Sequence, residues 1–386
     1  MRVLIDYRPA LRERSGSGEY THQLTKALLI SAAAAGRPRA IDITLFSSSW
    51  KDRLTPTPDL TGAAVVDRRV PVRLLNLAWH RLGWPPVEML AGGAYDVVHS
   101  PHPLLMPSRS AARVITIHDL NFLTHPERTR AEIRRDYAPL ARAHAHRADA
   151  ILVPSAYTAG EVERLLGVPR DRIAIGPPGA PGWPTRPAAP KDGYVLFFGT
   201  LEPRKNVGGL LDAWERVIAS AAPTRGATPE LVLAGRATDE ATPWLARIGR
   251  PPLLGTVRHI GYVADDDRRA LYNGARLLVH PSFEEGFGMT ILEAMSLGVP
   301  VVASDRGSLP EVIGGAGLLV DPDRPADIAH AIARVLDEDG LAELCAAQGM
   351  ARARAFRWED TADRVYDAYQ AAIERALTRR RIDSRS

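Results

Sequence analysis

The sequence contains very little cysteine and very little lysine. Cys345 is the one cysteine among 386 residues, which excludes a disulfide framework and any cysteine-rich metal cluster and makes a reducing cytoplasm the simpler compartment. Four lysines accompany 45 arginines, so a lysine in a candidate loop is informative. The hydrophobic content of 45% and the charged content of 24% are those of an ordinary globular protein, and the length suits two domains of middling size.

Long hydrophobic runs are also missing. The longest apolar stretch near the start, residues 27–36, is much shorter than the roughly 18 to 20 residues that a membrane span needs. The opening residues place Arg2, Asp6 and Arg8 around a short apolar run, unlike a secretory signal. We therefore expect no transmembrane helix and a protein that stays in the cytoplasm where it is made.

The net charge of +4 is unevenly distributed. Residues 1–178 hold 24 Lys and Arg against 17 Asp and Glu, whereas residues 179–386 hold 25 against 28. The basic surplus of the first half favours an acidic partner such as anionic lipid, a phosphate-bearing substrate or nucleic acid. An arginine-rich composition spread over solvated faces explains the same surplus.

Short apolar runs alternate with helical stretches along the whole chain. These runs lie at 2–6, 41–46, 97–100, 114–118 and 151–153, and again at 194–198, 231–233, 257–260, 277–279, 300–303 and 317–320. The alternation predicts parallel sheets with right-handed crossovers. The Pro- and Gly-rich stretch 176–193 can form neither helix nor central strand and predicts a junction between two α/β units. The spacing of apolar residues at 358–377 predicts a long final helix.

Ligands of parallel sheets bind beyond the carboxyl ends of the strands, and four loops there are candidate sites. The first contains Gly16 and Gly18 and leads into a helix whose amides favour an anion, although a tight turn without a ligand also explains it. The second is His118-Asp119, where His118 is expected to face the ligand. The alternative is a polar strand end, with Asp119 capping the next turn.

The third loop runs from Gly199 to Asn206. Arg204 and Lys205 are adjacent in it, and a bidentate guanidinium beside a mobile ammonium suits a diphosphate. The alternative is a solvated charged loop.

The fourth loop has the most specific pattern. Gly286 and Gly288 allow the backbone to turn against a ligand, and the helix expected at 289–297 presents its first amides to phosphate oxygens. Glu285 and Glu293 are expected to be two exposed acids. Because carboxylates repel phosphate, they would hold neutral hydroxyls instead, as on a sugar or a ribose.

These residues resemble the family 4 retaining glycosyltransferases of GT-B fold, whose signature is Glu-x7-Glu. Glu285 and Glu293 match its two glutamates, and residues 199–206 are similar to its donor-phosphate loop. The resemblance also covers residues 15–20, 118–120, 153–158 and 307–311. It implies an α/β fold of two facing Rossmann-like domains with an interdomain cleft. The implied parts are an acceptor-binding domain at 1–178, a linker at 179–192, a donor-binding domain at 193–357, and a C-terminal helix at 358–377 that crosses back to the first domain.

The resemblance implies transfer of a sugar from a nucleotide diphosphate donor with retained anomeric configuration. Arg204 and Lys205 would stabilise the departing diphosphate, Glu285 would hold hydroxyls of the donor sugar, and His118 would lie near the bond that breaks. Glu293 would hold the ribose hydroxyls. The other implied donor-binding residues are Gly16, Gly18, Gly199, Gly286, Phe287, Gly288, Met289 and Thr290.

No metal or other cofactor is expected, because two cations and a helix terminus can stabilise the diphosphate. The acidic run Asp265–Asp267 is interpreted as helix-start acids, with metal binding as the alternative. The implied partners are the nucleotide-sugar donor and a glycan or polyprenyl-diphosphate-linked acceptor. Peripheral contact with anionic membrane at its inner face is also expected, and a nucleic-acid partner is not.

The sugar and two other functions are left open. The strand end at His118, followed by His125-Pro126-Glu127, is similar to bacterial polysaccharide mannosyltransferases, which favours mannose linked to guanosine diphosphate over uridine-linked hexoses. A nucleotide-sugar isomerase of the same architecture is the first alternative, although the acid and base groups it needs around the sugar ring are poorly represented. A non-catalytic protein that binds sugar nucleotides is the second.

Overall fold

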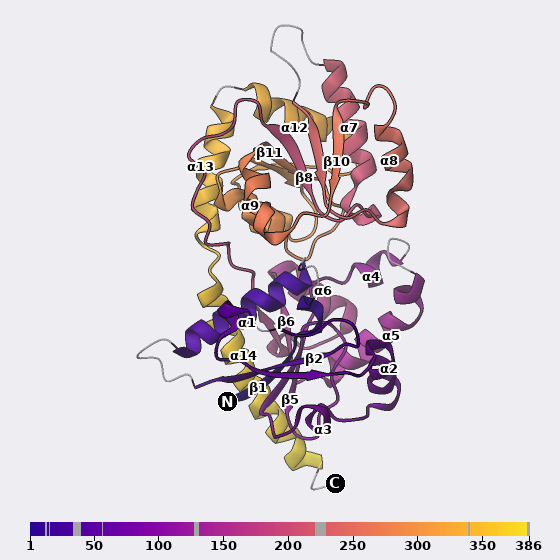
Figure 1. The fold of residues 1–386 in the computed structure, drawn as a ribbon, viewed down its shortest axis with the longest axis vertical. Coiled ribbons are helices and arrows are strands. Elements are labelled where there is room, and N and C mark those ends of the chain that lie inside the picture. Colours follow the sequence, from indigo (N-terminus) through magenta and orange to yellow (C-terminus); the bar gives the residue numbers. More distant parts are fainter. Residues whose placement is uncertain are drawn as a thin grey trace. The chain divides into compact units, whose positions relative to one another are not determined.

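The structure is a computed structural model that describes residues 1–11, 14, 16–33, 40–55, 57–126, 131–220, 229–338 and 340–383. It divides into two compact units, each drawn around its own sheet in Figure 1. The first unit comprises Met1–Gly179 and Arg357–Ser386, and the second comprises Ala180–Phe356. The boundary at Gly179 adjoins the predicted end of the first domain at residue 178.

The first unit is built on a seven-stranded parallel sheet of order β3-β2-β1-β4-β5-β6-β7. Its strands are β1 (Arg2–Asp6), β2 (Asp42–Ser48), β3 (Ala64–Arg68), β4 (Val97–Ser100), β5 (Ala112–Thr116), β6 (Ala150–Val153) and β7 (Ile173–Ile175). Its helices are α1 (Ser17–Ala33), α2 (Val72–Leu77), α3 (Val87–Ala91), α4 (Asn121–Thr124), α5 (Ala131–Arg147), α6 (Ala156–Leu166) and α14 (Trp358–Asp383).

The second unit is built on a six-stranded parallel sheet of order β10-β9-β8-β11-β12-β13. Its strands are β8 (Tyr194–Phe198), β9 (Leu231–Ala234), β10 (Val257–Gly261), β11 (Ala275–His280), β12 (Val301–Ser304) and β13 (Leu318–Val320). Its helices are α7 (Val207–Ser220), α8 (Thr242–Ile248), α9 (Asp265–Asn273), α10 (Met289–Ser296), α11 (Leu309–Ile313), α12 (Pro325–Asp337) and α13 (Leu341–Ala353).

Both faces of the second sheet are covered, which explains why its central strands are continuous apolar runs. Trp214 of α7 and Ile332 of α12 pack with Phe197 in one buried cluster, and Ile291 of α10 packs with Leu278 in another. Because the sheet is parallel, the carboxyl ends of its central strands β8 and β11 lie at one edge. The loops after these two strands are the third and fourth candidate loops.

Most of the predicted strands are present with small shifts, but β3 and β7 were missed. Both are edge strands in the first sheet. Every residue of β3 is at least partly accessible to solvent, and β7 has three residues. Neither produces the buried apolar run that identifies a central strand.

The segment predicted as a linker packs on the second unit. The Ala180 N–H donates to the Phe356 carbonyl at 2.9 Å, and Trp183 lies against the apolar cluster of that unit. The Arg186 guanidinium donates to the carbonyl oxygens of Ala275 and Gly298. Residues 180–186 therefore form a strap that is fixed to one unit, because its polar backbone and side-chain groups find partners there.

The last helix belongs to the first unit, as the predicted crossing back required. Tyr369 of α14 is buried, and its hydroxyl lies 2.8 Å from His99 Nδ1 at the end of β4. The Thr361 hydroxyl donates to the Pro177 carbonyl. Within the described residues, no helix combines the length and the apolar character that crossing a bilayer requires.

Candidate functional site

The turn after β8 presents the two predicted cations. Pro203–Lys205 form a single 3-10 turn, and Asn206 after it has a left-handed backbone with a φ of 55°. The Asn206 side chain fixes that conformation, because its Nδ2 donates to the Pro322 carbonyl at 2.7 Å and its Oδ1 accepts from the Gly209 N–H at 3.2 Å. The two cations are thereby held directly before the first turn of α7.

The loop between β11 and α10 is tied to this turn. The Phe283 N–H donates to the Arg204 carbonyl at 2.9 Å. The Glu285 carbonyl accepts from the Ser308 N–H at 3.1 Å and from its hydroxyl at 2.9 Å. A Cβ at Gly307 would lie 2.8 Å from the same carbonyl oxygen, so the backbone approaches closely here. These contacts position the Glu285 side chain toward the cations.

Three side chains converge on the Glu285 carboxylate. The Arg204 guanidinium donates to Oε2 at 3.0 Å, and the Lys205 ammonium donates to Oε1 at 2.5 Å. His280, the last residue of β11, lies 2.9 Å from Oε1 through its Nε2. Arg204 also donates to Glu202 at 2.8 Å. The third and fourth candidate loops therefore lie together in the second unit.

The expectation that both glutamates are exposed is wrong. Glu285 is 6% exposed and Glu293 is 5% exposed. Burial of a carboxylate is unfavourable unless cations or donors compensate its charge, and both glutamates have such partners. The sequence pattern gave the positions of the two acids but did not reveal which basic residues would cover them.

The pKa shifts follow from this arrangement. Burial by itself raises the pKa of the Glu285 carboxyl, but Lys205, Arg204 and His280 outweigh it and hold that pKa well below its ordinary value. Burial and the neighbouring Arg204 lower the pKa of the Lys205 ammonium, and Glu285 opposes the shift. Burial also lowers the pKa of His280, so the ring is neutral near pH 7 and its Nε2–H donates to the carboxylate.

Glu293 has its own partners one helical turn inside α10. Arg268 of α9 donates to its Oε1, and the Tyr272 hydroxyl donates to its Oε2 at 2.7 Å. Arg268 is also 3.5 Å from Asp265. Burial raises the pKa of the Tyr272 hydroxyl well above its ordinary value, and the charge of Glu293 adds to that effect. Tyr272 therefore remains a proton donor.

The start of α10 has the backbone geometry expected of a glycine turn. Gly288 precedes the helix with a φ of 104°, and a Cβ there would lie 2.8 Å from Leu309. The first intrahelical donor to the Gly288 carbonyl is the Ile291 N–H, so the amides of Met289 and Thr290 belong to the unsatisfied first turn. Gly286 and Phe287 are buried, and Phe287 packs edge-on against Phe356.

Gly199 is not required by local packing. A Cβ at Gly199 would meet only ordinary contacts, the closest at 3.7 Å from Lys205, and its φ is not positive. Local packing therefore leaves room beside Gly199, and its role in donor binding stays a prediction of the resemblance.

In the first unit, His118 lies two residues beyond the end of β5. Its Nε2 is 3.3 Å from the Pro101 carbonyl, and its ring meets Tyr20 edge-on with ring centroids 5.2 Å apart. Burial lowers the pKa of His118 to about 4, so its ring is neutral near pH 7. Asp119 accepts from the Asn121 N–H at 3.2 Å, as in the capping role given as the alternative.

The two glycines of the first loop differ in their surroundings. Gly16 is exposed with a φ of 54°, and nothing lies within 4 Å of a Cβ there. A Cβ at Gly18 would lie 2.5 Å from the Pro9 carbonyl oxygen, so close packing explains this glycine without a ligand. The neighbouring Ser15 lies outside the described residues, as does Glu127.

Several polar residues near these loops were not identified from the sequence. They are His280, Arg268 and Tyr272 in the second unit, and Asp6, Arg8 and His102 in the first. Asp6 ends β1, pairs with Arg8 at 2.6 Å and lies 3.2 Å from His102. Asp6 and His280 could have been identified by their positions, because each is a polar residue at the end of a buried strand.

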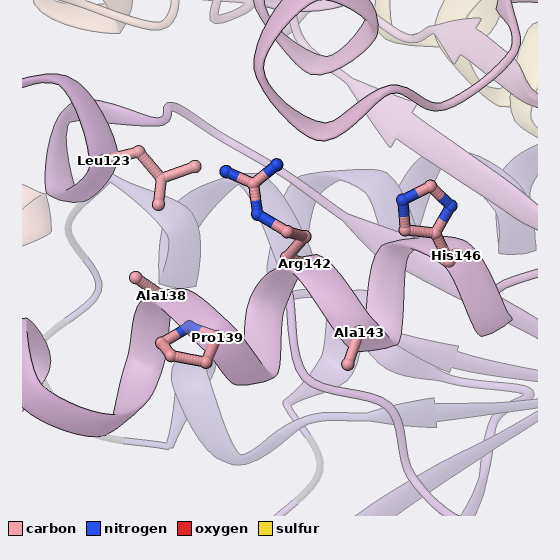
Figure 2. Close-up of a pocket in the computed structure, with 6 residues that line it drawn as sticks. All are labelled: Leu123, Ala138, Pro139, Arg142, Ala143 and His146. Carbon is pink, nitrogen blue, oxygen red and sulfur yellow. The ribbon is translucent and has the colours of Figure 1, made fainter.

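Two other features lie outside this site. Figure 2 shows a hollow on α5 that is lined by the side chains of Leu123, Ala138, Pro139, Arg142, Ala143 and His146, and none of these is a predicted site residue.

Asp265–Asp267 form the first turn of α9, as expected of helix-start acids. Among the described residues, no three His, Cys, Asp or Glu side chains are grouped as metal ligands would be, and metal independence stays a prediction.

Comparisons with known proteins cover almost the whole chain. Residues 15–181 match the family model described as Glycosyltransferase Family 4, and residues 192–338 match the model described as Glycosyl transferases group 1. The chain is 32% identical over 393 residues to the O-antigen chain mannosyltransferase B of Escherichia coli, with 96% of this chain and 100% of the relative covered.

Solved structures show the same fold. Sucrose-phosphate synthase from Thermosynechococcus elongatus has a TM-score of 0.73 at 19% identity, covering 100% of this chain and 99% of the other. WaaG, a glycosyltransferase involved in lipopolysaccharide biosynthesis, has a TM-score of 0.68 at 14% identity, covering 95% and 99%.

Proposed function

Because the chain belongs to the family 4 glycosyltransferases and has their GT-B fold, we propose that it transfers a hexose from a nucleotide diphosphate sugar with retention of the anomeric configuration. The proposed acceptor is a glycan, free or carried on a polyprenyl diphosphate at the inner face of a membrane. Membership of a transferase family favours this function over the isomerase and the non-catalytic binding protein.

One observation carries the proposal. Arg204 and Lys205 share the buried carboxylate of Glu285, four residues before Met289, whose amide opens α10. Arg204 also pairs with Glu202, so two carboxylates balance the two cations of this cluster, and the helix terminus adds partial positive charge. A departing diphosphate develops negative charge in the transition state, and preorganised donors of this kind stabilise it. This is the part of the reaction that the cluster is suited to assist.

The glutamates are proposed to hold hydroxyls rather than to attack the sugar. A carboxylate whose pKa is held low by two cations is a weak nucleophile, so Glu285 is poorly suited to form a covalent glycosyl intermediate. Its Oε1 accepts from Lys205 and His280, whereas its Oε2 accepts from Arg204 and retains a lone pair that can accept from a hydroxyl of the donor sugar. Glu293, held by Arg268 and Tyr272, is in the same way proposed to accept the ribose hydroxyls. His118 is proposed to lie near the bond that breaks, with its imidazole in the neutral form.

Mannose linked to guanosine diphosphate is the favoured donor. The support is the sequence pattern at His118 and the similarity to the Escherichia coli relative, which is named as a mannosyltransferase. The proposal includes no metal, since Arg204 and Lys205 supply the positive charge on the diphosphate.

The test begins with thermal unfolding of the full chain in the presence of guanosine, uridine and adenosine diphosphates. A ligand that binds only the folded protein raises the midpoint, and guanosine diphosphate is expected to raise it most. Transfer is then measured with the corresponding sugar nucleotide and a mannan oligosaccharide, and the product anomer is assigned by proton NMR.

Retention of configuration and activity in the presence of a chelator are the expected results. Isomerised donor sugar formed without any acceptor would contradict the transferase. An inverted product would contradict the stereochemistry, and activity lost to the chelator and restored only by a divalent ion would contradict metal independence.

A further inference from the structure

A short segment of the first unit exposes an unusual amount of apolar surface. Fifteen large hydrophobic side chains are exposed among the described residues, and six of them lie within residues 72–89. These six are Val72, Leu74, Leu77, Leu82, Trp84 and Met89. Five of them come from α2, from the helical turn Ala78–Leu82 that continues it, and from α3, and Trp84 lies between that turn and α3. Both α2 and α3 are marked in Figure 1. Single exposed apolar residues are ordinary, but a contiguous group indicates an interaction surface.

The backbone that presents these side chains is anchored. Leu75, Trp79 and Val87 are buried in one apolar cluster of the first unit, and Phe46 of β2 packs against the Trp79 ring. The Trp79 indole N–H donates to the Pro85 carbonyl at 2.9 Å. The exposed residues therefore project from a fixed scaffold.

The helical part is apolar on both of its faces. Leu75 and Trp79, four residues apart, point into the core, while Leu74 and Leu77, three apart, are 61% and 58% exposed. Leu82 and Trp84 continue the outer side at 75% and 58%. Leucines on the outer side of a helix whose inner side is already packed in the core are normally covered, and these have no covering partner among the described residues.

Arginines surround the apolar side chains. Arg68, Arg69, Arg73 and Arg81 are all exposed, and the one acid within residues 68–91 is Glu88. The Glu88 carboxylate accepts from the Ser108 hydroxyl and the Arg109 N–H, so it is engaged within the unit. The segment thus combines exposed Leu, Trp and Met with positive charge, a composition typical of elements that lie in a membrane interface.

We propose that residues 68–89 form a docking surface for an anionic lipid bilayer, in which Leu74, Leu77, Leu82 and Trp84 enter the headgroup region and the arginines bind lipid phosphates. A second copy of this chain is a poorer occupant. A two-fold interface would bring the same patch of four arginines against itself, and like charges would oppose the contact. Anionic lipid offers an apolar layer and negative charge together.

This surface deepens the proposed function, because it would hold the enzyme where a lipid-linked acceptor lies. Lipid binding is nevertheless measured without donor or acceptor. Vesicle binding without sugar transfer would refute the proposed transferase and leave the surface standing, and transfer to a soluble oligosaccharide without vesicle binding would do the reverse.

The first experiment is co-sedimentation of the full chain with vesicles of phosphatidylcholine alone or with added phosphatidylglycerol. The wild type is expected to bind the second and scarcely the first. Leu77→Ser combined with Trp84→Ala, and separately Arg73→Glu combined with Arg81→Glu, are each expected to weaken binding at least about tenfold. Leu344→Ser and Arg216→Glu are the matched controls, because both residues are exposed in the second unit, and they should bind as the wild type does.

A second measurement detects insertion directly and does not depend on loss of binding. Cys345 is the only cysteine and is buried, so Cys345→Ser gives a background into which one label can be placed. An environment-sensitive fluorophore on Leu82→Cys should shift to shorter wavelength with phosphatidylglycerol vesicles. The same fluorophore on Leu344→Cys should not shift.

Three results would overturn the proposal: no preference of the wild type for phosphatidylglycerol, unchanged binding by both double variants, or no spectral shift at Leu82→Cys. A dimer in solution that becomes a monomer on Trp84→Ala would also overturn it, because the surface would then be an interface between copies.

Discussion

Glu285 is hydrogen-bonded by Arg204, Lys205 and His280, so the protein neutralises the positive loop with its own carboxylate before any ligand binds. A diphosphate that enters this site competes for the same two cations. Glu285 would then be free to accept hydrogen bonds from hydroxyls of the donor sugar. This exchange explains how a carboxylate can lie beside a site for the negatively charged diphosphate. This exchange makes separate predictions for the cations and for the acid.

The double variant Arg204→Ala, Lys205→Ala should lose the two side chains that are proposed to stabilise the departing diphosphate. Removal of one charge-stabilising donor commonly costs about a hundredfold to a thousandfold in rate, so kcat/KM should fall at least that far. Steady-state transfer at saturating acceptor measures the effect. A double variant with wild-type rates would refute the role, and its thermal midpoint shows whether the fold survives a buried Glu285 that keeps only its contact with His280.

Glu285→Gln should separate the sugar contact from the phosphate contact. The substitution keeps the shape but removes the negative charge beside two partly buried cations, so the free nucleoside diphosphate should bind at least as tightly as to the wild type. Turnover should fall by about tenfold or more, because a carboxylate accepts hydroxyl hydrogen bonds more strongly than an amide does. Calorimetric titration and initial rates provide the two readouts. An unchanged kcat/KM would count against the sugar contact.

At the residue scale, the sequence placed Arg204, Lys205 and Glu285 in two loops that follow strands, but their direct pairing is known only from the structure. The sequence did not predict His280, whose role depends on the register that ends β11 beside Glu285. The burial of Glu285 and Glu293 was equally hidden, since it depends on Arg204 and Arg268 reaching them from other elements.

Among the elements, α14 depends on a charged contact at the amino-terminal edge of the first sheet. Asp149 precedes β6, is 4% exposed and accepts from the Arg113 N–H at 2.8 Å. Arg379 of α14 pairs with the same carboxylate, and Arg375 of α14 pairs with Asp171. One buried acid therefore joins the helix to the strands.

Asp149→Asn should destabilise the protein. The substitution leaves Arg113 and Arg379 without their shared counter-charge, and breaking a partly buried pair of this kind costs about 2 to 4 kcal/mol in the free energy of unfolding. Denaturant titration gives the value. Asp171→Asn is the matched control, because its carboxylate is mostly exposed and its loss should stay within about 0.5 kcal/mol. Equal effects of the two substitutions would refute the argument.

The central elements of each sheet were more predictable than its edge strands. The central strands and α10 follow from apolar runs and the glycine turn, whereas the short edge strands β3 and β7 lack a buried signature. The sequence predicted a linker at 179–192, but the contacts of Trp183 and Arg186 with the second unit leave no local pattern from which the strap at 180–186 could be predicted.

Over the whole molecule, buried histidines should set the response to acid. Burial lowers the pKa of His80, His118 and His144 to about 4 and that of His99 to about 3. Their unfolded pKa is near 6.5, so between about pH 6.5 and 4 the unfolded chain binds more protons than the folded one. Stability should therefore fall as the pH falls through this window.

Thermal midpoints measured from pH 7.5 to pH 5 are expected to decline below about pH 6.5. His99→Gln should make the decline shallower, because it removes the most strongly shifted of these groups. His146→Gln, at an exposed position on the same unit, should leave the slope unchanged. A midpoint that is constant across the range would contradict the assignment.

The first unit is assembled from two stretches separated by the entire second unit, since α14 packs on β5, β6 and β7 after the chain has passed through residues 180–356. During translation, the whole of the second unit is therefore synthesised before the last helix of the first unit. Tyr369, the partner of His99, is therefore synthesised only when translation is almost finished. In nascent chains halted near residue 356, we expect protease to cut the incomplete first unit and the second unit to resist it.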